Sequence, residues 1–387
     1  ATEKGKGILK AIRSIPSTMR ELKKADILVW GGGQLLQDIS SRLYIPFHTS
    51  RLALAILLKK PAFVHSIGAG PIKSKLDRLL TRLLLNRASA VTVRDRYSAE
   101  VLESCGIDAA RITEVPDPAL VLRPDECFDA CSYLKGLGLD LARPTLGVAV
   151  RRLFHRGHGL LPIKYKVKLG LISSGQRARF EEFKCELARF ADYVISRFGF
   201  QVLFIPMYSE AGQNDQGVGR EIASLASQRA DIFHLPVGLE CRKVLSIISR
   251  MKAMVAVRMH AAVLSAVANV PLLSIHYASK GKSFMSDIGL ADYTLAAEDM
   301  ACDILVRKFS DLITNYDEIK SVLLENVRTS SMGLLANVSR IRQILGMGPL
   351  AEELVHEFMN VHCPDGEDGG GLADSDLEFH CLANEQN

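Results

Sequence analysis

Two polar side chains interrupt an apolar run about two thirds of the way along the chain. Arg258 and His260 stand two residues apart within KAMVAVRMHAAVLSAVANVPLLSI, residues 252–275. The apolar residues predict a buried strand followed by a helix of small residues that begins near His260. A guanidinium matches the geometry of a carboxylate or phosphate, and an imidazole titrates near neutral pH. The pair therefore indicates binding of an anion together with proton transfer.

Further cations follow other predicted strands of the same half. Arg151 and Arg152 come directly after one strand, and His276 and Lys280 follow another. The carboxyl ends of parallel strands meet at one edge of a sheet, so these side chains are predicted to share a rim with Arg258. A single arginine at a strand end is more often paired, and a single histidine among apolar residues is more often a satisfied core residue. We therefore expect Arg152 to be paired and His276 to be a core residue whose hydrogen bonds are satisfied.

Glycines and charged residues follow strands of the N-terminal half. Gly31, Gly32 and Gly33 come after an apolar run, where they would let the backbone approach a ligand closely. Arg94 and Asp95 follow a later run, so both are candidate substrate-binding residues at a strand end. Adjacent opposite charges of this kind favour a structural ion pair or a helix N-cap over catalysis.

Short apolar runs alternate with helical patterns along most of the chain. Continuous rather than alternating apolarity is typical of parallel strands buried on both faces, and the order strand–helix–strand indicates a doubly wound α/β fold. Two such series occur, and we predict two Rossmann-like domains. The predicted strands are 26–30, 62–67, 90–93 and 111–115 in the first series and 145–150, 201–205, 231–235, 253–257 and 271–275 in the second.

The pattern predicts four segments. Residues 1–122 form an N-terminal Rossmann-like domain, and residues 123–144, which contain Pro and Gly, form a linker. Residues 145–348 form a C-terminal Rossmann-like domain. Residues 349–387 form an extension whose acidic tail has too little hydrophobicity to pack and is expected to be disordered. Ligands of such domain pairs bind at the carboxyl ends of the strands.

Composition excludes several classes of protein. The net charge of +5 is mild, and no dense basic stripe with interleaved aromatic residues predicts nucleic-acid binding. No apolar run approaches the length of a membrane span. The eight cysteines include no Cys-x-x-Cys pair, which favours reduced thiols in the cytoplasm and predicts no metal site.

Several segments together resemble the polysaccharide pyruvyltransferase family. They fall in order between about residues 22 and 292, and the combination of GGG-x-L-L-Q-D, TVRD-x-x-S and R-x-H is more specific than any one of them. The matching segments are ADILVWGGGQLLQD, SIGAGPI, LLNRASAVTVRDRYSAEVLESCGI, PDPAL, GVAVR and VAVRMHAAVLSAVANVPLLSIHYASKGKSFMSDIGL.

The resemblance implies a glycosyltransferase-B-like pair of Rossmann-like domains and a reaction. The pyruvyl group of phosphoenolpyruvate would pass to two hydroxyls of a sugar, forming a cyclic ketal and releasing phosphate. Arg151, Arg258 and His260 would hold the donor, with the backbone of Met259 beside them, and Lys280 stands where the family often has a lysine. Phosphoenolpyruvate would serve as co-substrate, without any further cofactor or metal.

The acid/base residues and the acceptor are less closely defined. His260 suits proton transfer because it titrates near neutrality, and Asp38 or Asp95 could take a proton from a sugar hydroxyl. The sugar would approach from the region of Gly31–Gly33 and Asp38. It would be a free sugar or a lipid-linked oligosaccharide of a cell-surface or cell-wall polysaccharide. The protein would be cytoplasmic, with peripheral contact to the membrane surface.

The N-terminus departs from the family pattern. Family members usually begin with a strand and a Gly-Asn-x-Gly-Asp-type loop, whereas this chain starts with a basic helix-like segment at 4–24. We therefore expect either a fragment or a reduced N-terminal domain, whose sheet would expose an edge.

Two other readings stay open. The same architecture serves glycosyltransferases that use nucleotide-sugars, because fold does not fix function. Such enzymes commonly place a Glu after the late strands, but here SIHYASKGKS offers no acid before Asp287. The other reading is a non-catalytic glycan-binding or scaffold protein.

Overall fold

The computed structural model describes residues 15–38, 44–153, 173–208, 214–277 and 279–351, together with 353–355 and 358. Residues Ala1–Leu350 form one compact unit, and Ala351–Asn387 form a second. The fold and the site described below belong to the first unit. The predicted acidic tail and the beginning of the basic N-terminal segment lie outside the described residues.

The first unit contains a four-stranded parallel sheet in its N-terminal half. Its order is β1–β2–β3–β4, the order of the strands along the chain. The strands are β1 (Leu28–Leu36), β2 (Ala62–Ala69), β3 (Ala90–Val93) and β4 (Ile112–Glu114). A helix at 15–24 precedes them, and α2 (Tyr44–Leu57), α3 (Lys75–Leu85) and α4 (Arg96–Ser104) connect the strands.

A second, six-stranded parallel sheet follows. Its order is β10–β9–β8–β5–β6–β7. Read from β5 as the first strand, this is the 3-2-1-4-5-6 order of a Rossmann fold, with its reversal between β5 and β8. The strands are β5 (Thr145–Ala149), β6 (Gln201–Phe204), β7 (Ile232–His234), β8 (Ala253–Ala256), β9 (Leu272–His276) and β10 (Thr294–Ala296).

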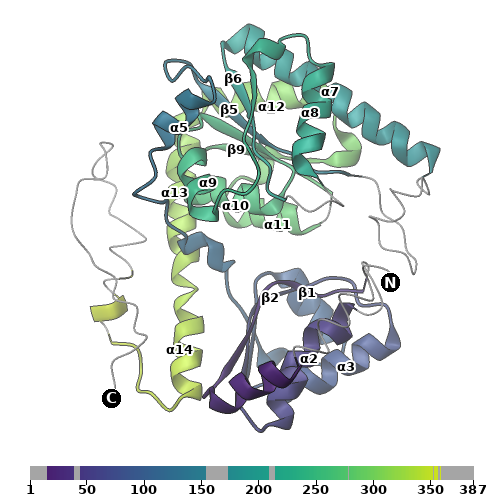
Figure 1. The fold of residues 1–387 in the computed structure, drawn as a ribbon, viewed down its shortest axis with the longest axis vertical. Coiled ribbons are helices and arrows are strands. Elements are labelled where there is room, and N and C mark those ends of the chain that lie inside the picture. Colours follow the sequence, from purple (N-terminus) through teal and green to yellow (C-terminus); the bar gives the residue numbers. More distant parts are fainter. Residues whose placement is uncertain are drawn as a thin grey trace. The chain divides into compact units, whose positions relative to one another are not determined.

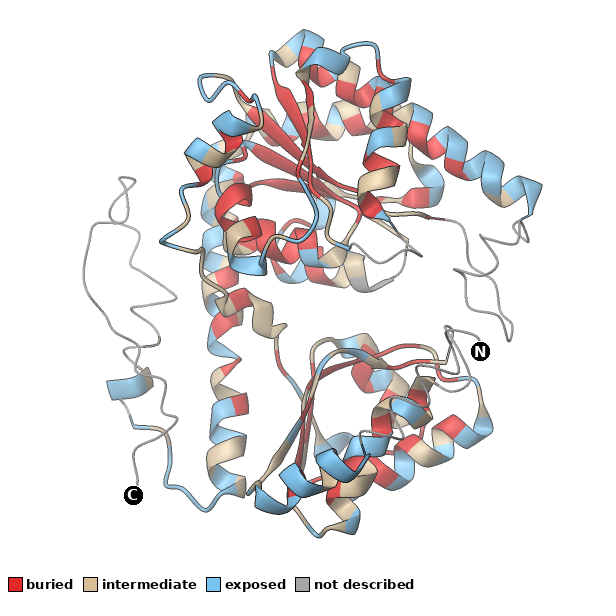
Figure 2. Cartoon of the chain, viewed as in Figure 1, coloured by how far each residue is buried: buried red, intermediate tan, exposed pale blue. Residues whose placement is uncertain are grey.

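Helices lie on both faces of the second sheet (Figure 1). The strands are largely buried and the outer sides of the helices are exposed (Figure 2). The helices that follow α4 along the chain are α5 (Ala130–Gly136), α7 (Ser174–Phe198), α8 (Asp215–Leu225), α9 (Cys241–Ile248), α10 (Met259–Val267), α11 (Ser279–Asp287), α12 (Cys302–Thr314) and α13 (Tyr316–Met332). The last helix, α14 (Leu335–Ile344), contacts β2 of the first sheet instead. The predicted fold class, α/β with two Rossmann-like sheets, is confirmed.

Three elements differ from the sequence prediction. The strand expected to end before the glycines continues through them, because β1 runs to Leu36. The short strand β10 and the helix α11 were not predicted, since neither has a strong apolar pattern.

The last helix returns to the first sheet. Asn337 of α14 donates from Nδ2 to Oγ of Ser66 at 3.0 Å and accepts from Oγ1 of Thr92 at 2.9 Å. All three side chains are buried. Because buried polar groups must find partners, this network fixes α14 against β2 and β3.

The segment 123–144 contains helix α5. Ala130 and Leu134 of this helix belong to the same buried cluster as Leu146 of the second sheet. The domain boundaries given above stay predictions. Among the described residues, no helix is both long enough and apolar enough to cross a membrane.

Candidate functional site

Two arginines stand at the point where the order of the second sheet reverses. Strands β5 and β8 are neighbours, Ala149 pairs with Ala256, and the N–H of Val257 donates to the carbonyl of Ala149 at 2.9 Å. Arg151 and Arg258 each follow their strand by two residues. The strands diverge to opposite connections here, which opens a crevice where ligands of such folds bind. The structure therefore brings this predicted pair to one place.

Arg258 is oriented by a buried carboxylate. Its Nε and Nη2 lie 3.0 and 2.5 Å from the two carboxylate oxygens of Asp215, whose side chain is 0% exposed. The ring of Tyr208 lies under the guanidinium at 5.3 Å. Burial raises the pKa of Asp215, while the hydrogen bonds and charge of Arg258 and the charge of Arg151 oppose that rise. The planar fork of Arg258 is therefore held in one orientation.

Sequence reasoning missed Asp215. It is the first residue of α8, the helix that follows β6. Asp215 lies between two predicted strands, but its pairing with Arg258 depends on the order of the strands in the sheet, which a sequence alone does not give.

Arg151 is held by an aromatic side chain. It donates from Nη1 to the hydroxyl of Tyr277 and lies 4.4 Å from the centre of that ring. Tyr277 follows β9, so residues after three neighbouring strands converge at this rim. An arginine stacked on an aromatic ring keeps its charge, while its side chain is restricted to fewer orientations.

His260 is the second residue of α10, and Arg258 is the N-cap of this helix. Its side chain reaches solvent, yet protein atoms crowd around the ring. This desolvation lowers the pKa of His260, and the charges of Arg94 and Arg258 lower it further, whereas Asp117 raises it. The imidazole is therefore favoured in its neutral form, which can accept a proton.

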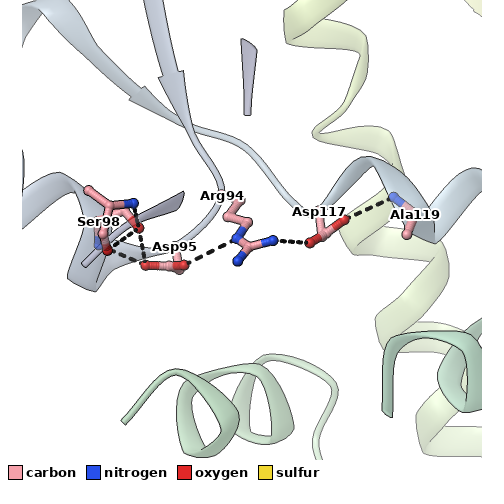
Figure 3. A network of polar contacts seen from close by, with 6 residues as sticks. Arg94, Asp95, Ser98, Asp117 and Ala119 are labelled. Atoms are coloured by element: carbon pink, nitrogen blue, oxygen red, sulfur yellow. Dashed lines mark hydrogen bonds and ion pairs between the residues drawn. The ribbon is translucent and has the colours of Figure 1, made fainter. Parts of the chain in front are cut away.

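The residues of the first sheet that act on His260 form a charged chain. Figure 3 shows Arg94 between Asp95 and Asp117, with Nη1 3.1 Å from Oδ2 of Asp117 and Nε 3.7 Å from Oδ2 of Asp95. The Arg94 side chain is only 5% exposed. The glycine at 68 permits this, because a Cβ there would lie 2.9 Å from Nε of Arg94.

Asp95 caps a helix, as expected. Its Oδ1 accepts from the N–H and from the hydroxyl of Ser98, both at 2.7 Å, at the start of α4. The ion pair with Arg94 was the other expected structural role.

A cavity of about 410 Å³ opens beside Arg94. Its wall includes Met259 and Phe284 from helices of the second sheet. Burial raises the pKa of the Asp287 carboxyl, and the charges of Asp95 and Glu114 add to the rise. Four carboxyl groups, those of Asp95, Glu114, Asp117 and Asp287, outnumber two guanidinium groups, those of Arg94 and Arg96. This excess of carboxyl groups favours neutral ligands with hydroxyl donors over anions.

The glycines that were predicted to contact a ligand do not lie after the strand, where they were expected. Gly31, Gly32 and Gly33 lie inside β1 and not after it, which corrects the predicted strand end. A Cβ at Gly31 would lie 1.9 Å from the carbonyl oxygen of His65, so the residue is required by the close approach of β2. Gly32 has φ of 73° and Gly33 of 142°, conformations that favour glycine.

Asp38 is engaged with the backbone. Its Oδ2 accepts from the N–H groups of Lys73 and Ser74, at 2.6 and 2.7 Å, and so holds the loop that leads into α3. No contact in the described part of the chain links Asp38 with His260. Its predicted role as a base stays a prediction.

Three other residues were predicted to lie at the same rim. Lys280 is the second residue of α11, and its side chain lies outside the described part. Arg152 pairs with Glu221 at 3.4 Å, as expected of a strand-end arginine. His276 ends β9 half-buried, and its Nδ1 finds no hydrogen-bond partner among the described residues, so it is not the satisfied core residue expected.

Comparison of the sequence with known proteins gives consistent results. Residues 4–279 match the family model described as polysaccharide pyruvyl transferase. The amylovoran biosynthesis protein AmsJ of Erwinia amylovora is 20% identical over 333 residues, which covers 82% of this chain and 73% of AmsJ.

Similar solved structures show the same fold at low identity. MnaA of S. aureus with UDP has a TM-score of 0.53 at 11% identity and covers 87% of this chain and 80% of its own. The UDP-GlcNAc 2-epimerase of Neisseria meningitidis bound to UDP-GlcNAc has a TM-score of 0.51 at 12% identity, with coverage of 87% and 80%. These similarities support the glycosyltransferase-B-like arrangement of two Rossmann-like domains.

Proposed function

We propose that this chain, which belongs to the polysaccharide pyruvyl transferase family, transfers the pyruvyl group of phosphoenolpyruvate to two hydroxyls of one sugar. The product would be a cyclic ketal on a cell-surface or cell-wall polysaccharide or its precursor, and phosphate would be released. Family membership supports a role in polysaccharide pyruvylation. The donor and the ketal chemistry are the proposal, with the cytoplasm as the place of reaction.

The observation that carries the proposal is the pair Arg151 and Arg258 at the reversal of the sheet. Phosphoenolpyruvate carries a carboxylate and a phosphate ester on the same carbon atom, so its binding requires more than one fixed cation. The pairing with Asp215 uses Nε and Nη2 of Arg258, which leaves Nη1 to face the donor. Arg151 is held by a hydrogen bond from its Nη1 to the Tyr277 hydroxyl and by contact with the ring.

The proposed reaction balances without an external reagent. Carbon 3 of the enol gains a proton as positive charge develops on carbon 2, and the first sugar hydroxyl bonds to carbon 2. The bond between carbon 2 and the phosphate oxygen then breaks, and the second hydroxyl takes its place. The two hydroxyl protons end on carbon 3 and on the released phosphate.

His260 is the group proposed to move a proton in this sequence. Its lowered pKa makes the neutral imidazole available to accept a proton from a hydroxyl. The bound donor would add negative charge beside the ring and raise the pKa of His260 again, which would help the resulting imidazolium to return the proton.

For the acceptor we favour the cavity beside Arg94 over the region of Gly31–Gly33 and Asp38. Its carboxyl groups can accept hydrogen bonds from sugar hydroxyls, and Met259 at its wall adjoins His260. Asp38 instead holds a backbone loop. Proton transfer to Asp95 is disfavoured, because its carboxylate already caps α4.

The test is an assay of phosphate release from phosphoenolpyruvate in the presence of a panel of neutral sugars. Formation of the ketal would be followed by NMR through its methyl group. Release that depends on both donor and acceptor, and that falls by about 10²–10⁴-fold in His260→Gln, is the expected result. Transfer from a nucleotide-sugar instead of phosphoenolpyruvate would replace this proposal with the glycosyltransferase reading.

A further inference from the structure

Helix α3 turns a stripe of leucines toward solvent. Leu76, Leu79 and Leu83 are 68%, 44% and 43% exposed, and their spacing places them on one face of the helix. The opposite face buries two further leucines but also Asp77 and Thr81, which are 1% and 0% exposed. A surface helix of a globular protein ordinarily shows the reverse distribution.

The side chains around this stripe carry one sign of charge. Lys73, Lys75, Arg82 and Arg87 are all exposed. The one acid between residues 71 and 90 is Asp77, which is buried. The solvent-facing side of α3 is therefore both apolar and cationic.

We propose that the α3 surface, formed by Leu76, Leu79, Leu83, Lys75 and Arg82, docks on a membrane that contains anionic lipids. Leucines on such a face enter the boundary between headgroups and acyl chains, and neighbouring lysine and arginine side chains pair with lipid phosphates. The inference rests on the proposed function in one respect: docking would hold the enzyme near a sugar acceptor that is linked to a lipid.

Charge argues against a second copy of this chain as the occupant. A two-fold contact between α3 surfaces would place cations of one copy against cations of the other. A nucleic acid would match the cations but leave the leucines exposed. An anionic lipid surface can bury the leucines and pair with the cations at the same time.

The experiment is co-sedimentation of the full chain with vesicles, in the absence of phosphoenolpyruvate. Vesicles of phosphatidylcholine with phosphatidylglycerol are expected to bind the protein, less so at high salt, whereas vesicles of phosphatidylcholine alone bind weakly. The triple change of Leu76, Leu79 and Leu83 to Ser is expected to weaken binding by about a hundredfold or more.

A matched control carries three serines at apolar positions of similar exposure. Leu225, Leu324 and Val338 are 46%, 41% and 43% exposed and lie on other helices. Their triple change to Ser should leave vesicle binding unchanged. Changing Lys75 and Arg82 together to Gln should weaken binding to the anionic vesicles by roughly 30-fold.

Several results would overturn the proposal. They are absence of wild-type binding to the anionic vesicles, equal binding by the leucine variant, and binding to soluble polyglutamate as tight as to vesicles, which would assign an acidic protein. A dimer in sedimentation velocity that the leucine variant dissociates would assign a second copy.

Failure here and failure of the proposed function are distinguishable. Vesicle binding is measured without donor or acceptor, so it does not depend on pyruvyl transfer. Conversely, the leucine variant should transfer pyruvyl groups to a water-soluble sugar at the wild-type rate, because none of the residues proposed to act on the donor belongs to the α3 surface.

Discussion

At the scale of single residues, charged side chains that follow strands of both sheets shift the pKa of His260. Arg94 and Asp117 follow strands of the first sheet, Arg258 follows a strand of the second, and all three act on the imidazole. Arg94 and Asp117 pair directly. The proton affinity of His260 is thus set by the balance of one carboxylate against two guanidinium groups and desolvation.

Changing Asp117 to Asn should lower the pKa of His260 further, because the one charge that raises this pKa is removed. If neutral His260 is the required form, the acidic limb of the profile of kcat/KM against pH moves to lower pH. Asn keeps a side-chain oxygen for the N–H of Ala119, so the turn should survive. Glu114→Gln serves as control, since Glu114 lines the same cavity without acting on His260. A shift toward higher pH would contradict this account.

Arg258 and Asp215 should behave as a coupled pair. Removing Arg258 alone, as in Arg258→Ala, leaves a carboxylate that is 0% exposed without its partner, which is expected to lower the free energy of unfolding by about 3–5 kcal/mol. Adding Asp215→Asn should recover most of that loss, because no buried charge then remains. Urea unfolding of the two single variants and the double variant measures the coupling, and additive losses would refute it.

The candidate donor residues could be predicted from the sequence, but their partners could not. Arg151 and Arg258 follow apolar runs, and the rule that ligands bind at strand ends identifies them without coordinates. Asp215 and Asp117 are distant in sequence, and their proximity to Arg258 and His260 depends on strand order and on how the strands of both sheets end. No local pattern carries that information.

At the scale of elements, the glycines of β1 show how a motif can be placed correctly and interpreted wrongly. The sequence correctly indicated a strand followed by a Gly-rich segment. Strand β1 nevertheless continues through Gly31, because an absent side chain there lets the backbone of His65 in β2 come close. Apolar periodicity ends at glycine, whereas backbone pairing does not.

Gly31→Ala is therefore expected to destabilise the protein by several kcal/mol, because its Cβ would overlap the carbonyl of His65 and force β1 and β2 apart. Gly32→Ala is the matched control. It has φ of 73° but open space around a Cβ, so about 1–2 kcal/mol of backbone strain is expected. Equal losses in urea unfolding of the two variants would refute the packing role of Gly31.

Asn337 should be essential to the contact of α14 with the first sheet. Asn337→Leu leaves the side-chain oxygens of Ser66 and Thr92 without this partner in a buried environment, and a loss of about 1–3 kcal/mol is expected. Hydrogen exchange of β2 and β3 should accelerate in the variant. Unchanged exchange there, with faster exchange in α13 alone, would contradict the role given to the network.

At the scale of the whole molecule, folding favours the neutral form of the five histidines that lie in the described part of the chain. Desolvation lowers the pKa of each below its ordinary value of 6.5; they are His48, His65, His234, His260 and His276. The unfolded chain therefore binds more protons as the pH falls through that value. By linkage, these histidines contribute stability that is present at higher pH and is lost on acidification.

The slope of stability against pH tests this contribution. Between about pH 7.5 and 5.5, replacing His65 and His234 together with Gln should make the fall in the free energy of unfolding shallower than in the wild type. The comparison between variants removes the opposing effect of Asp77, Asp215 and Asp287, whose pKa values are raised. Identical slopes would show that neither histidine changes its pKa on folding.

The central claim is that phosphoenolpyruvate binds at the reversal of the second sheet, and thermal-shift titration tests it most directly. A ligand at 100 times its dissociation constant stabilises a protein by about 2.7 kcal/mol, which gives a visible shift in Tm. The shift should appear in the wild type, and it should vanish in Arg151→Ala and in the double variant Asp215→Asn/Arg258→Ala, which leaves no unpaired buried charge. A shift with phosphoenolpyruvate that both variants retain, or a shift with a nucleotide-sugar alone, would contradict it.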